Sequence, residues 1–150
     1  SILPSTQRLI AVAGSPYPMH DHWGIPSQIF VGTLEGLTEE NRQRFNRRMC
    51  GGKRYKQLYD ILSERPTTEL RDELQAVYDS LVTSEAPETT PHTCLAWDLA
   101  IIGERDQIFP AKNLATLWKA VNVPTLLLPD GYHYLFDLWH SWSELWESIE

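Results

Sequence analysis

The run CLAWDLAIIG at 94–103 gives the first strong indication of how this chain folds. It is largely apolar and ends on a glycine, and a second apolar run, VPTLLLP at 123–129, follows a segment of helical pattern from about 111 to 121. Strand, helix and strand at this spacing predict parallel βαβ units. An earlier run, RLIAVAG at 8–14, predicts a third strand that is buried on both faces. The sequence therefore predicts an α/β fold, a parallel sheet with flanking helices.

The pattern between the first and second of these strands is helical. Thr38, followed by Glu39 and Glu40, predicts a helix start, because the hydroxyl can cap the first turn and carboxylates suit the positive end of the helix dipole. The pair Gly51-Gly52 predicts its end. A last helix is expected from about Tyr134 onward, with an apolar stripe formed by Leu135, Leu138, Trp139, Trp142, Leu145 and Trp146.

These patterns divide the chain into two parts. We interpret residues 1–21 and 91–150 as an α/β core and residues 22–90 as an inserted helical lid.

Composition narrows the class of protein. An apolar share of 42% in 150 residues is typical of one folded domain. Cys50 and Cys94 lie far apart without metal-ligand spacing, so we expect a reduced, cytoplasmic protein without a disulfide. No apolar run approaches the roughly 20 residues of a membrane span, so no membrane association is expected.

Basic residues are concentrated in one segment. The net charge is −7, yet residues 41–56 carry +7 and the rest of the chain −14. This pattern favours an anionic partner bound at one place over non-specific binding of nucleic acid, although a solvated helix face explains it equally well. The residues concerned are Arg42, Arg44, Arg47, Arg48, Lys53, Arg54 and Lys56.

Two polar residues follow the predicted strands. Asp106 comes just after the run 94–103, and His133 just after the run 123–129. Because functional groups of parallel sheets collect beyond the carboxyl ends of strands, the pair suits a carboxylate that orients a catalytic imidazole. Gly103 and Gly131 are expected to supply the backbone freedom of the two turns. The alternative is two ordinary loops with ordinary polar residues.

Four stretches carry a resemblance to a known family. They are LIAVAGSPYPMHDHWGIP (9–26), GTLEGLTEENRQRFNRRMCGGK (32–53), IIGERDQIFP (101–110) and YHYLFDLWHSWSELWE (132–147). Together they resemble the pimeloyl-ACP methyl ester esterases of biotin synthesis, in particular the BioG-type branch. The resemblance extends from residue 7 to residue 150.

The resemblance implies a carboxylesterase on the α/β-hydrolase fold that needs no cofactor. A serine would attack the methyl ester of pimeloyl-acyl carrier protein, with His133 as general base and then acid, and Asp106 orienting it. The lid arginines Arg42, Arg44, Arg47 and Arg48 would bind the acidic carrier protein or its phosphopantetheine. Trp23 would line the acyl pocket, although simple packing explains it equally well.

The family's nucleophile elbow has no counterpart in this sequence. The only Gly-Ser, at 14–15, is followed by Pro16, so Ser15 is interpreted as a loop residue. The chain therefore resembles the C-terminal part of such an esterase, with roughly 70 to 100 residues missing if the absent strands come in βαβ units of usual length. The serine would lie upstream or on another polypeptide.

Three alternatives stay open at this stage. Many α/β-hydrolases share the acid and histidine positions but act on lactones, thioesters or halides. A chain without a nucleophile also fits a binding module that docks an acidic carrier protein without catalysis. The motif HDH at 20–22 could chelate a metal, but a histidine pair without a distant partner is weak support, and we predict no metal site.

Overall fold

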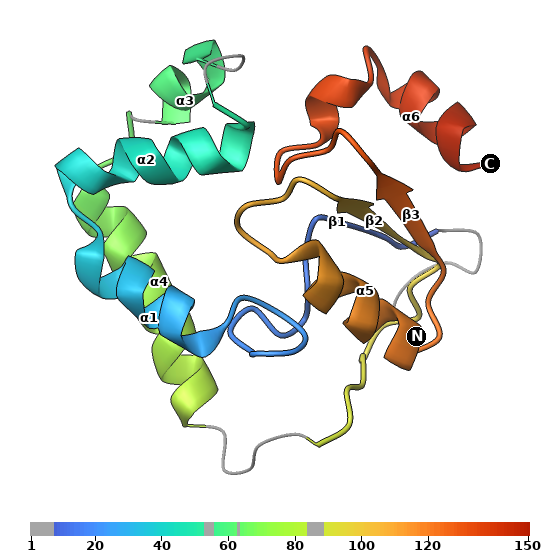
Figure 1. Cartoon of the computed structure of the whole chain (residues 1–150), viewed down its shortest axis with the longest axis horizontal. Helices are drawn as coiled ribbons and strands as arrows, with labels where there is room; N and C mark the ends of the chain where they lie inside the picture. Colours follow the sequence, from blue (N-terminus) through green and yellow to red (C-terminus); the bar gives the residue numbers. More distant parts are fainter. Residues whose placement is uncertain (1–7, 53–55, 63, 84–88) are drawn as a thin grey trace.

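The protein is an α/β structure, described by a computed structural model for residues 8–52, 56–62, 64–83 and 89–150 (Figure 1). Residues 1–7 of the predicted core, and Lys53 and Arg54 of the basic segment, lie outside these ranges. The described elements in chain order are β1 (Ile10–Val12), α1 (Ser27–Gly36), α2 (Glu39–Cys50), α3 (Lys56–Leu62), α4 (Thr67–Val82), β2 (Leu99–Gly103), α5 (Ala111–Ala120), β3 (Thr125–Leu128), the 3₁₀ turn η2 (Phe136–Leu138) and α6 (Trp142–Ile149).

The three strands form one parallel sheet in the order β1-β2-β3. Ile10 pairs with Leu99 in the first ladder, and Ala100 pairs with Thr125 in the second. The predicted parallel βαβ arrangement is therefore confirmed, and the carboxyl ends of β2 and β3 lie side by side.

The central strand β2 sends alternate side chains to two apolar layers, as the two-residue period of a strand requires. Ala100 and Ile102 pack with Leu114, Leu117 and Trp118 of α5 on one face. Ile101 packs with Leu135 on the other face, beside Leu138, Trp139 and Ile149 from the end of the chain. The sheet is thus covered by α5 on one side and by the C-terminal segment on the other.

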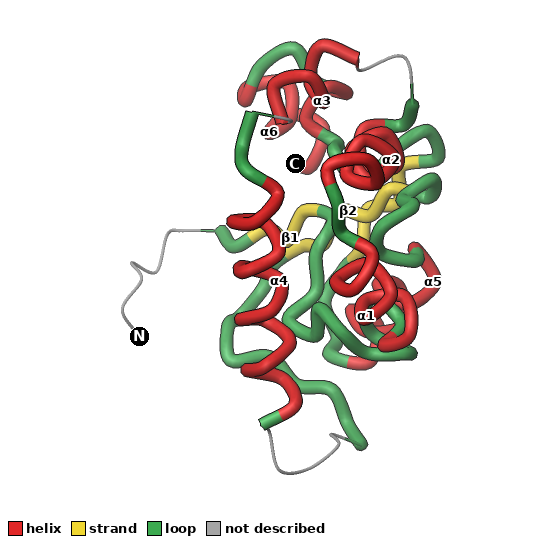
Figure 2. Tube along the Cα trace, turned by 90° about the vertical axis from the view of Figure 1, so that its left-hand side faces the viewer, coloured by secondary structure: helices red, strands yellow, loops and turns green. Residues whose placement is uncertain are grey.

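Helices α1 to α4 lie to one side of the sheet, and their described residues fall between positions 27 and 82, within the segment whose pattern predicted helices. Seen from their side, α1, α2 and α4 lie in front of the strands (Figure 2). Helix α1 packs against α4, and α2 packs against α3. None of the helices in the described ranges is both long and apolar enough to cross a membrane.

Both predicted ends of α2 are confirmed. The Thr38 side chain accepts a hydrogen bond from the backbone N–H of Asn41, and Glu39 and Glu40 occupy the first turn. Gly51 ends the helix in the left-handed conformation, at φ 80°, and donates its N–H to the carbonyl of Arg47.

The predicted C-terminal helix was wrong in its start. The chain makes the 3₁₀ turn η2 and then begins α6 only at Trp142. The Ser141 hydroxyl accepts from the backbone N–H of Glu144, while the Glu144 carboxylate accepts from the N–H of His140, a variant of the reciprocal capping box. The break also divides the predicted stripe, because Leu135 is fully buried whereas Trp142 is 69% exposed.

A backbone contact brings the loops after β2 and β3 together. A Cβ added to Gly103 would lie 2.5 Å from the carbonyl oxygen of Gly131, and the Arg105 N–H donates to that same oxygen at 2.9 Å. Gly103 and Gly131 both lie in the described ranges and neither has a positive φ. The expectation that they supply backbone freedom to the two turns was therefore wrong. They are needed because a side chain would not fit between the two backbones.

We predict that Gly103→Ala lowers the free energy of unfolding by about 1–3 kcal/mol, because its methyl group must displace the Gly131 backbone. Urea denaturation of the chain measures this change. Gly32→Ala is the matched control: it lies in α1 with nothing within 4 Å of its Cβ, so alanine there should stabilise the chain by about 0.5–1 kcal/mol. Equal effects of the two substitutions would contradict the role given to the Gly103 contact.

Candidate functional site

Asp106 and His133, singled out from the sequence, are in direct contact. Asp106 follows β2, His133 follows β3, and the Nδ1 of His133 lies 2.9 Å from the Oδ2 of Asp106. The Asp106 side chain is fully buried, and that of His133 is 24% exposed. With an ionised carboxylate as acceptor, Nδ1 carries the proton and Nε2 is left as the basic nitrogen.

The second oxygen of Asp106 is held by the backbone of its own loop. Oδ1 accepts hydrogen bonds from the N–H groups of Ile108 at 2.7 Å and Phe109 at 2.9 Å. Two such bonds satisfy a buried carboxylate and keep its other oxygen aimed at the imidazole. The turn of 106–109 ends at Pro110, which caps α5 through its carbonyl, so the acid is fixed to the start of a helix.

Phe109 is a site residue that sequence analysis missed. Its ring stacks on His133 with centroids 5.8 Å apart and an interplanar angle of 21°. The sequence did contain a signal for it. An Asp side chain often accepts hydrogen bonds from the backbone N–H groups two and three residues further along the chain, and such a turn brings residue 109 back toward the acid. Phe109 thus covers one face of the imidazole.

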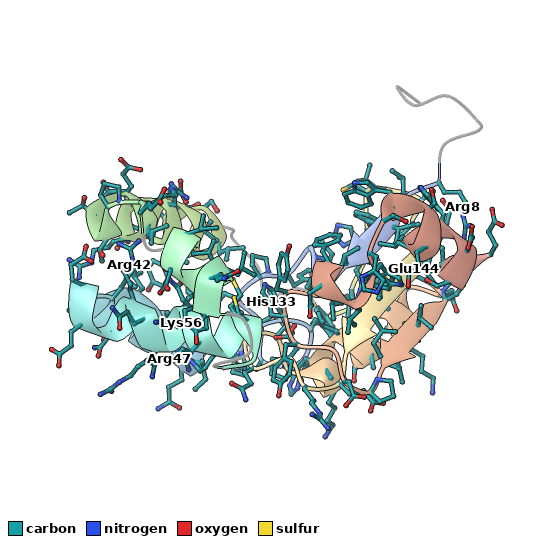
Figure 3. The ribbon with its side chains drawn as sticks, turned by 90° about the horizontal axis from the view of Figure 1, so that it is seen from above. Arg8, Arg42, Arg47, Lys56, His133 and Glu144 are labelled. Atoms are coloured by element: carbon teal, nitrogen blue, oxygen red, sulfur yellow. The ribbon has the colours of Figure 1, made fainter. Side chains whose placement is uncertain are left out.

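The Nε2 atom of His133 has no hydrogen-bond partner within the ranges that the structure describes. The ring lies between the helices α1–α4 and the sheet (Figure 3). An imidazole held at Nδ1, stacked on one face and unengaged at Nε2 can accept a proton from a nucleophile that approaches Nε2.

Two side chains of this chain that could act as nucleophiles are placed for other roles. The Ser15 hydroxyl donates to the carbonyl of Trp23 at 2.7 Å and accepts from the N–H of Tyr17 at 2.9 Å, as befits a loop residue. Cys50 is a free thiol with no exposed surface, and burial raises its pKa. Since the thiolate is the reactive form, Cys50 is poorly suited to attack a substrate.

Three of the four predicted anion-binding arginines are exposed on α2. They are Arg44, Arg47 and Arg48, and Arg47 points away from the helices in Figure 3. Arg44 and Arg48 line a groove of about 720 Å³ between α1 and α2, together with Ile29 and Phe45. Asp106 and His133 are not among the residues that line this groove, so it is a surface separate from the acid–histidine pair.

Arg42 is a correction to the prediction, because only 3% of it is exposed. Its guanidinium donates to the Thr67 hydroxyl and to the carbonyl of Leu62, both at 3.0 Å, and pairs with Glu39 at 3.4 Å. The Thr67 hydroxyl also bonds Glu39 and holds the pKa of that carboxyl below its usual value. Arg42 therefore joins α2 to the start of α4 and is not presented to a partner.

Trp23 is 8% exposed and packs in the apolar layer that contains α5. The His20 ring stacks on it with centroids 4.1 Å apart, and the Nδ1 of His20 accepts from the N–H groups of His22 and Trp23. This burial agrees with simple packing, and the role of Trp23 in an acyl pocket stays a prediction. No group of three or more potential metal ligands is found among the described residues, which include the HDH motif.

Comparisons with known proteins give a family match over most of the chain. The sequence model of the family described as "Pimeloyl-ACP methyl esterase BioG" matches residues 5–145. The chain is 42% identical over 135 residues to the malonyl-[acyl-carrier protein] O-methyltransferase of Bacteroides fragilis (strain 638R), which covers 89% of this chain and 26% of that protein. It is 36% identical over 137 residues to an uncharacterized protein of Haemophilus influenzae (strain Rd KW20), covering 91% of this chain and 60% of that protein.

A solved structure is similar as well. The crystal structure of selenomethionine-labelled BioG from Haemophilus influenzae, at 1.49 Å resolution, superposes with a TM-score of 0.79 and 34% sequence identity, over 93% of this chain and 62% of that one. The chain thus spans less than two thirds of the length of each of these relatives.

We predict that Asp106→Asn reverses the tautomer of His133. In the variant, the side-chain oxygen of the asparagine keeps the two hydrogen bonds from the backbone N–H groups, so its NH₂ group faces Nδ1 of His133. Nδ1 must then accept a hydrogen bond, and the ring carries its proton on Nε2. The ¹⁵N chemical shifts of the His133 ring distinguish the two tautomers. Asp130→Asn is the matched control, since Asp130 is 75% exposed and pairs with Arg105. A His133 tautomer unchanged by Asp106→Asn would contradict the role given to the carboxylate.

Proposed function

Because the chain belongs to the BioG family of pimeloyl-ACP methyl esterases, we propose that it supplies the acid and the base of a carboxylesterase of biotin synthesis. The substrate is the methyl ester of pimeloyl-acyl carrier protein. The observation that carries the proposal is the 2.9 Å contact between buried Asp106 and the Nδ1 of His133, which leaves Nε2 available for a nucleophile.

The proposed architecture is the C-terminal part of an α/β-hydrolase fold. Residues 1–21 and 91–150 belong to its core, and residues 22–90, with α1 to α4, form its lid. The positions of the two polar residues support this assignment, since the acid follows one strand of a parallel sheet and the histidine follows the next. In α/β-hydrolases the order along the chain is nucleophile, acid and then histidine.

The nucleophile of the proposed reaction is a serine outside residues 1–150. His133 takes the hydroxyl proton on Nε2 as the serine oxygen attacks the ester carbonyl, and Asp106 stabilises the imidazolium through Nδ1–H. The same ring then returns the proton to the departing methoxide, so that methanol leaves and an acyl-enzyme remains. Water, activated by His133, releases the free carboxylate.

Hydrolysis is favoured over methyl transfer for this segment. The match covers 26% of the Bacteroides fragilis relative, which is named a methyltransferase, and 60% of the Haemophilus influenzae relative. Since the two matched segments are of similar length, the Bacteroides fragilis protein is more than twice as long as the Haemophilus influenzae protein. The name of the longer protein therefore need not describe the matched segment. An acid–imidazole pair with an unengaged Nε2 suits acyl transfer to a hydroxyl.

We place the acyl carrier protein at the groove between α1 and α2. Arg44 and Arg48 provide cationic groups on the α2 wall, and Ile29 and Phe45 provide apolar surface. Guanidinium groups pair with the carboxylates of an acidic protein and with the phosphate of a phosphopantetheine arm. Arg42 is excluded from this role by its burial. An acyl carrier protein appears in the names of both the matching family and the methyltransferase relative.

We predict that a fluorophosphonate labels one serine outside residues 1–150 when this chain is produced with any sequence that adjoins it in its gene, or with the polypeptide that supplies the serine. His133→Ala should slow the labelling by about 10³-fold or more, because the serine loses its base. Labelling is measured by intact mass and peptide mapping. His140→Ala is the control, since the hydrogen bond from His140 to Glu144 is donated by the backbone N–H, which alanine keeps. A label on Ser15, or labelling that does not depend on His133, would disprove the mechanism.

We predict that Arg44→Glu combined with Arg48→Glu raises KM for carrier-bound pimeloyl methyl ester by about tenfold. Hydrolysis of a small ester such as p-nitrophenyl acetate should change by less than about twofold, because it needs no carrier contact. The matched control reverses two charges on α5, with Lys112→Glu and Lys119→Glu, and should leave both substrates unaffected. Equal losses on the two substrates would refute the docking site.

A further inference from the structure

The C-terminal end of α2 contacts the loop that carries His133 (Figure 1). The Tyr132 ring lies against Gly51, where an added Cβ would stand 2.6 Å from a ring carbon. The backbone N–H of Tyr134 donates to the carbonyl of Met49 at 3.1 Å. The last turn of α2 therefore holds the residue before the histidine and the residue after it.

Gly51 permits this contact through two properties. Its φ of 80° ends the helix in a conformation that glycine adopts at no steric cost, and its lack of a side chain leaves room for the Tyr132 ring. Gly52 shares the first property only. It has φ 89°, but nothing lies within 4 Å of its added Cβ.

The hydrogen bond to Asp106 is insufficient to fix the direction of Nε2. A single bond at Nδ1 positions one atom of the ring, and the ring can still swing about that atom if the backbone of 132–134 moves. Phe109 restrains one face of the ring. The backbone on both sides of His133 is restrained by α2, through Gly51 and Met49.

We propose that Gly51 and Tyr132 are positioning residues, through which the end of α2 sets the direction of the His133 imidazole. The helix that carries Arg44 and Arg48 then also sets the geometry of the base. This inference deepens the proposed function and rests on it for its catalytic consequence. Its structural part, the coupling of α2 to the ring, stands on the contacts alone.

The first experiment uses the 150-residue chain and needs no substrate. Gly51→Ala should shift the ring ¹H–¹⁵N resonances of His133, because the methyl group displaces Tyr132. Gly52→Ala, which places alanine in the same left-handed region without a clash, should leave these resonances unchanged. Similar resonances for His133 in wild type and Gly51→Ala would overturn the proposal. The two variants share backbone strain, so a general loss of stability appears in both.

Tyr132→Ala provides a second variant that introduces no strain at Gly51. It removes Cγ and the ring carbons that lie against Gly51, and it should move the His133 resonances even if Gly51→Ala does not fold. In the double variant Gly51→Ala, Tyr132→Ala, the resonances should match those of Tyr132→Ala alone, because residue 132 then has no atom beyond Cβ to clash with the new methyl group. His133 resonances unaffected by Tyr132→Ala would also overturn the proposal.

The catalytic consequence is measured with a small ester on the same protein preparation that is used for labelling. Gly51→Ala should lower kcat by about ten- to a hundredfold with KM unchanged, since misplacement of a catalytic group by about 1 Å is enough for such a loss. Gly52→Ala should keep the wild-type kcat. If wild type itself neither turns over nor takes the serine label, the proposed function fails, while the resonance experiment still decides the positioning role. Equal kcat values for the two alanine variants would overturn the catalytic part.

Discussion

The close approach of Gly103 and Gly131 is the constraint on which the site depends. Their backbones meet at a distance that leaves no room for a Cβ, and this contact joins the loops that follow β2 and β3. The Arg105 N–H bonds the Gly131 carbonyl, so the contact is also hydrogen-bonded. Asp106 and His133 then face one another although they are 27 positions apart in the chain.

A parallel sheet explains why so short a chain can assemble this pair. Strands that run the same way end at the same edge, and α5 lies between them in sequence without separating their ends. The Asp106 turn leads directly into α5 and the His133 loop leads into η2, so both polar residues are attached to packed elements. Rigid supports of this kind give a small site its geometry.

The parts of the fold that follow from local chemistry could be predicted from the sequence. The limits of α2 follow from a capping threonine, two carboxylates and a glycine, all of which act within a few residues. The pairing of Asp106 with His133 followed from their positions after two strands. The break at Ser141 was also encoded locally, by the hydrogen-bonding residues at 141 and 144, but the apolar periodicity of 135–146 hid it.

The features that could not be predicted depend on residues distant in the sequence. Arg42 resembles its neighbours on α2, and its burial is decided by Thr67 and the carbonyl of Leu62, which are 25 and 20 positions away. The contact between Gly51 and Tyr132 depends on how the helical segment lies against the sheet. Helical periodicity places a side chain on a face, but tertiary packing decides what that face meets.

Electrostatics explains why the exposed arginines of α2 can direct a partner although the chain is acidic as a whole. Residues outside 41–56 carry −14 in total, a charge that repels an acidic protein. The +7 of residues 41–56 is the one large concentration of positive charge in the sequence, and Arg44 and Arg48 expose part of it beside the apolar surface of the groove. Attraction at one place and repulsion elsewhere favour a single orientation of encounter more strongly than a uniformly basic surface would. The same helix ends against the His133 loop, so an acidic protein oriented by these arginines is held on the element that contacts the proposed base.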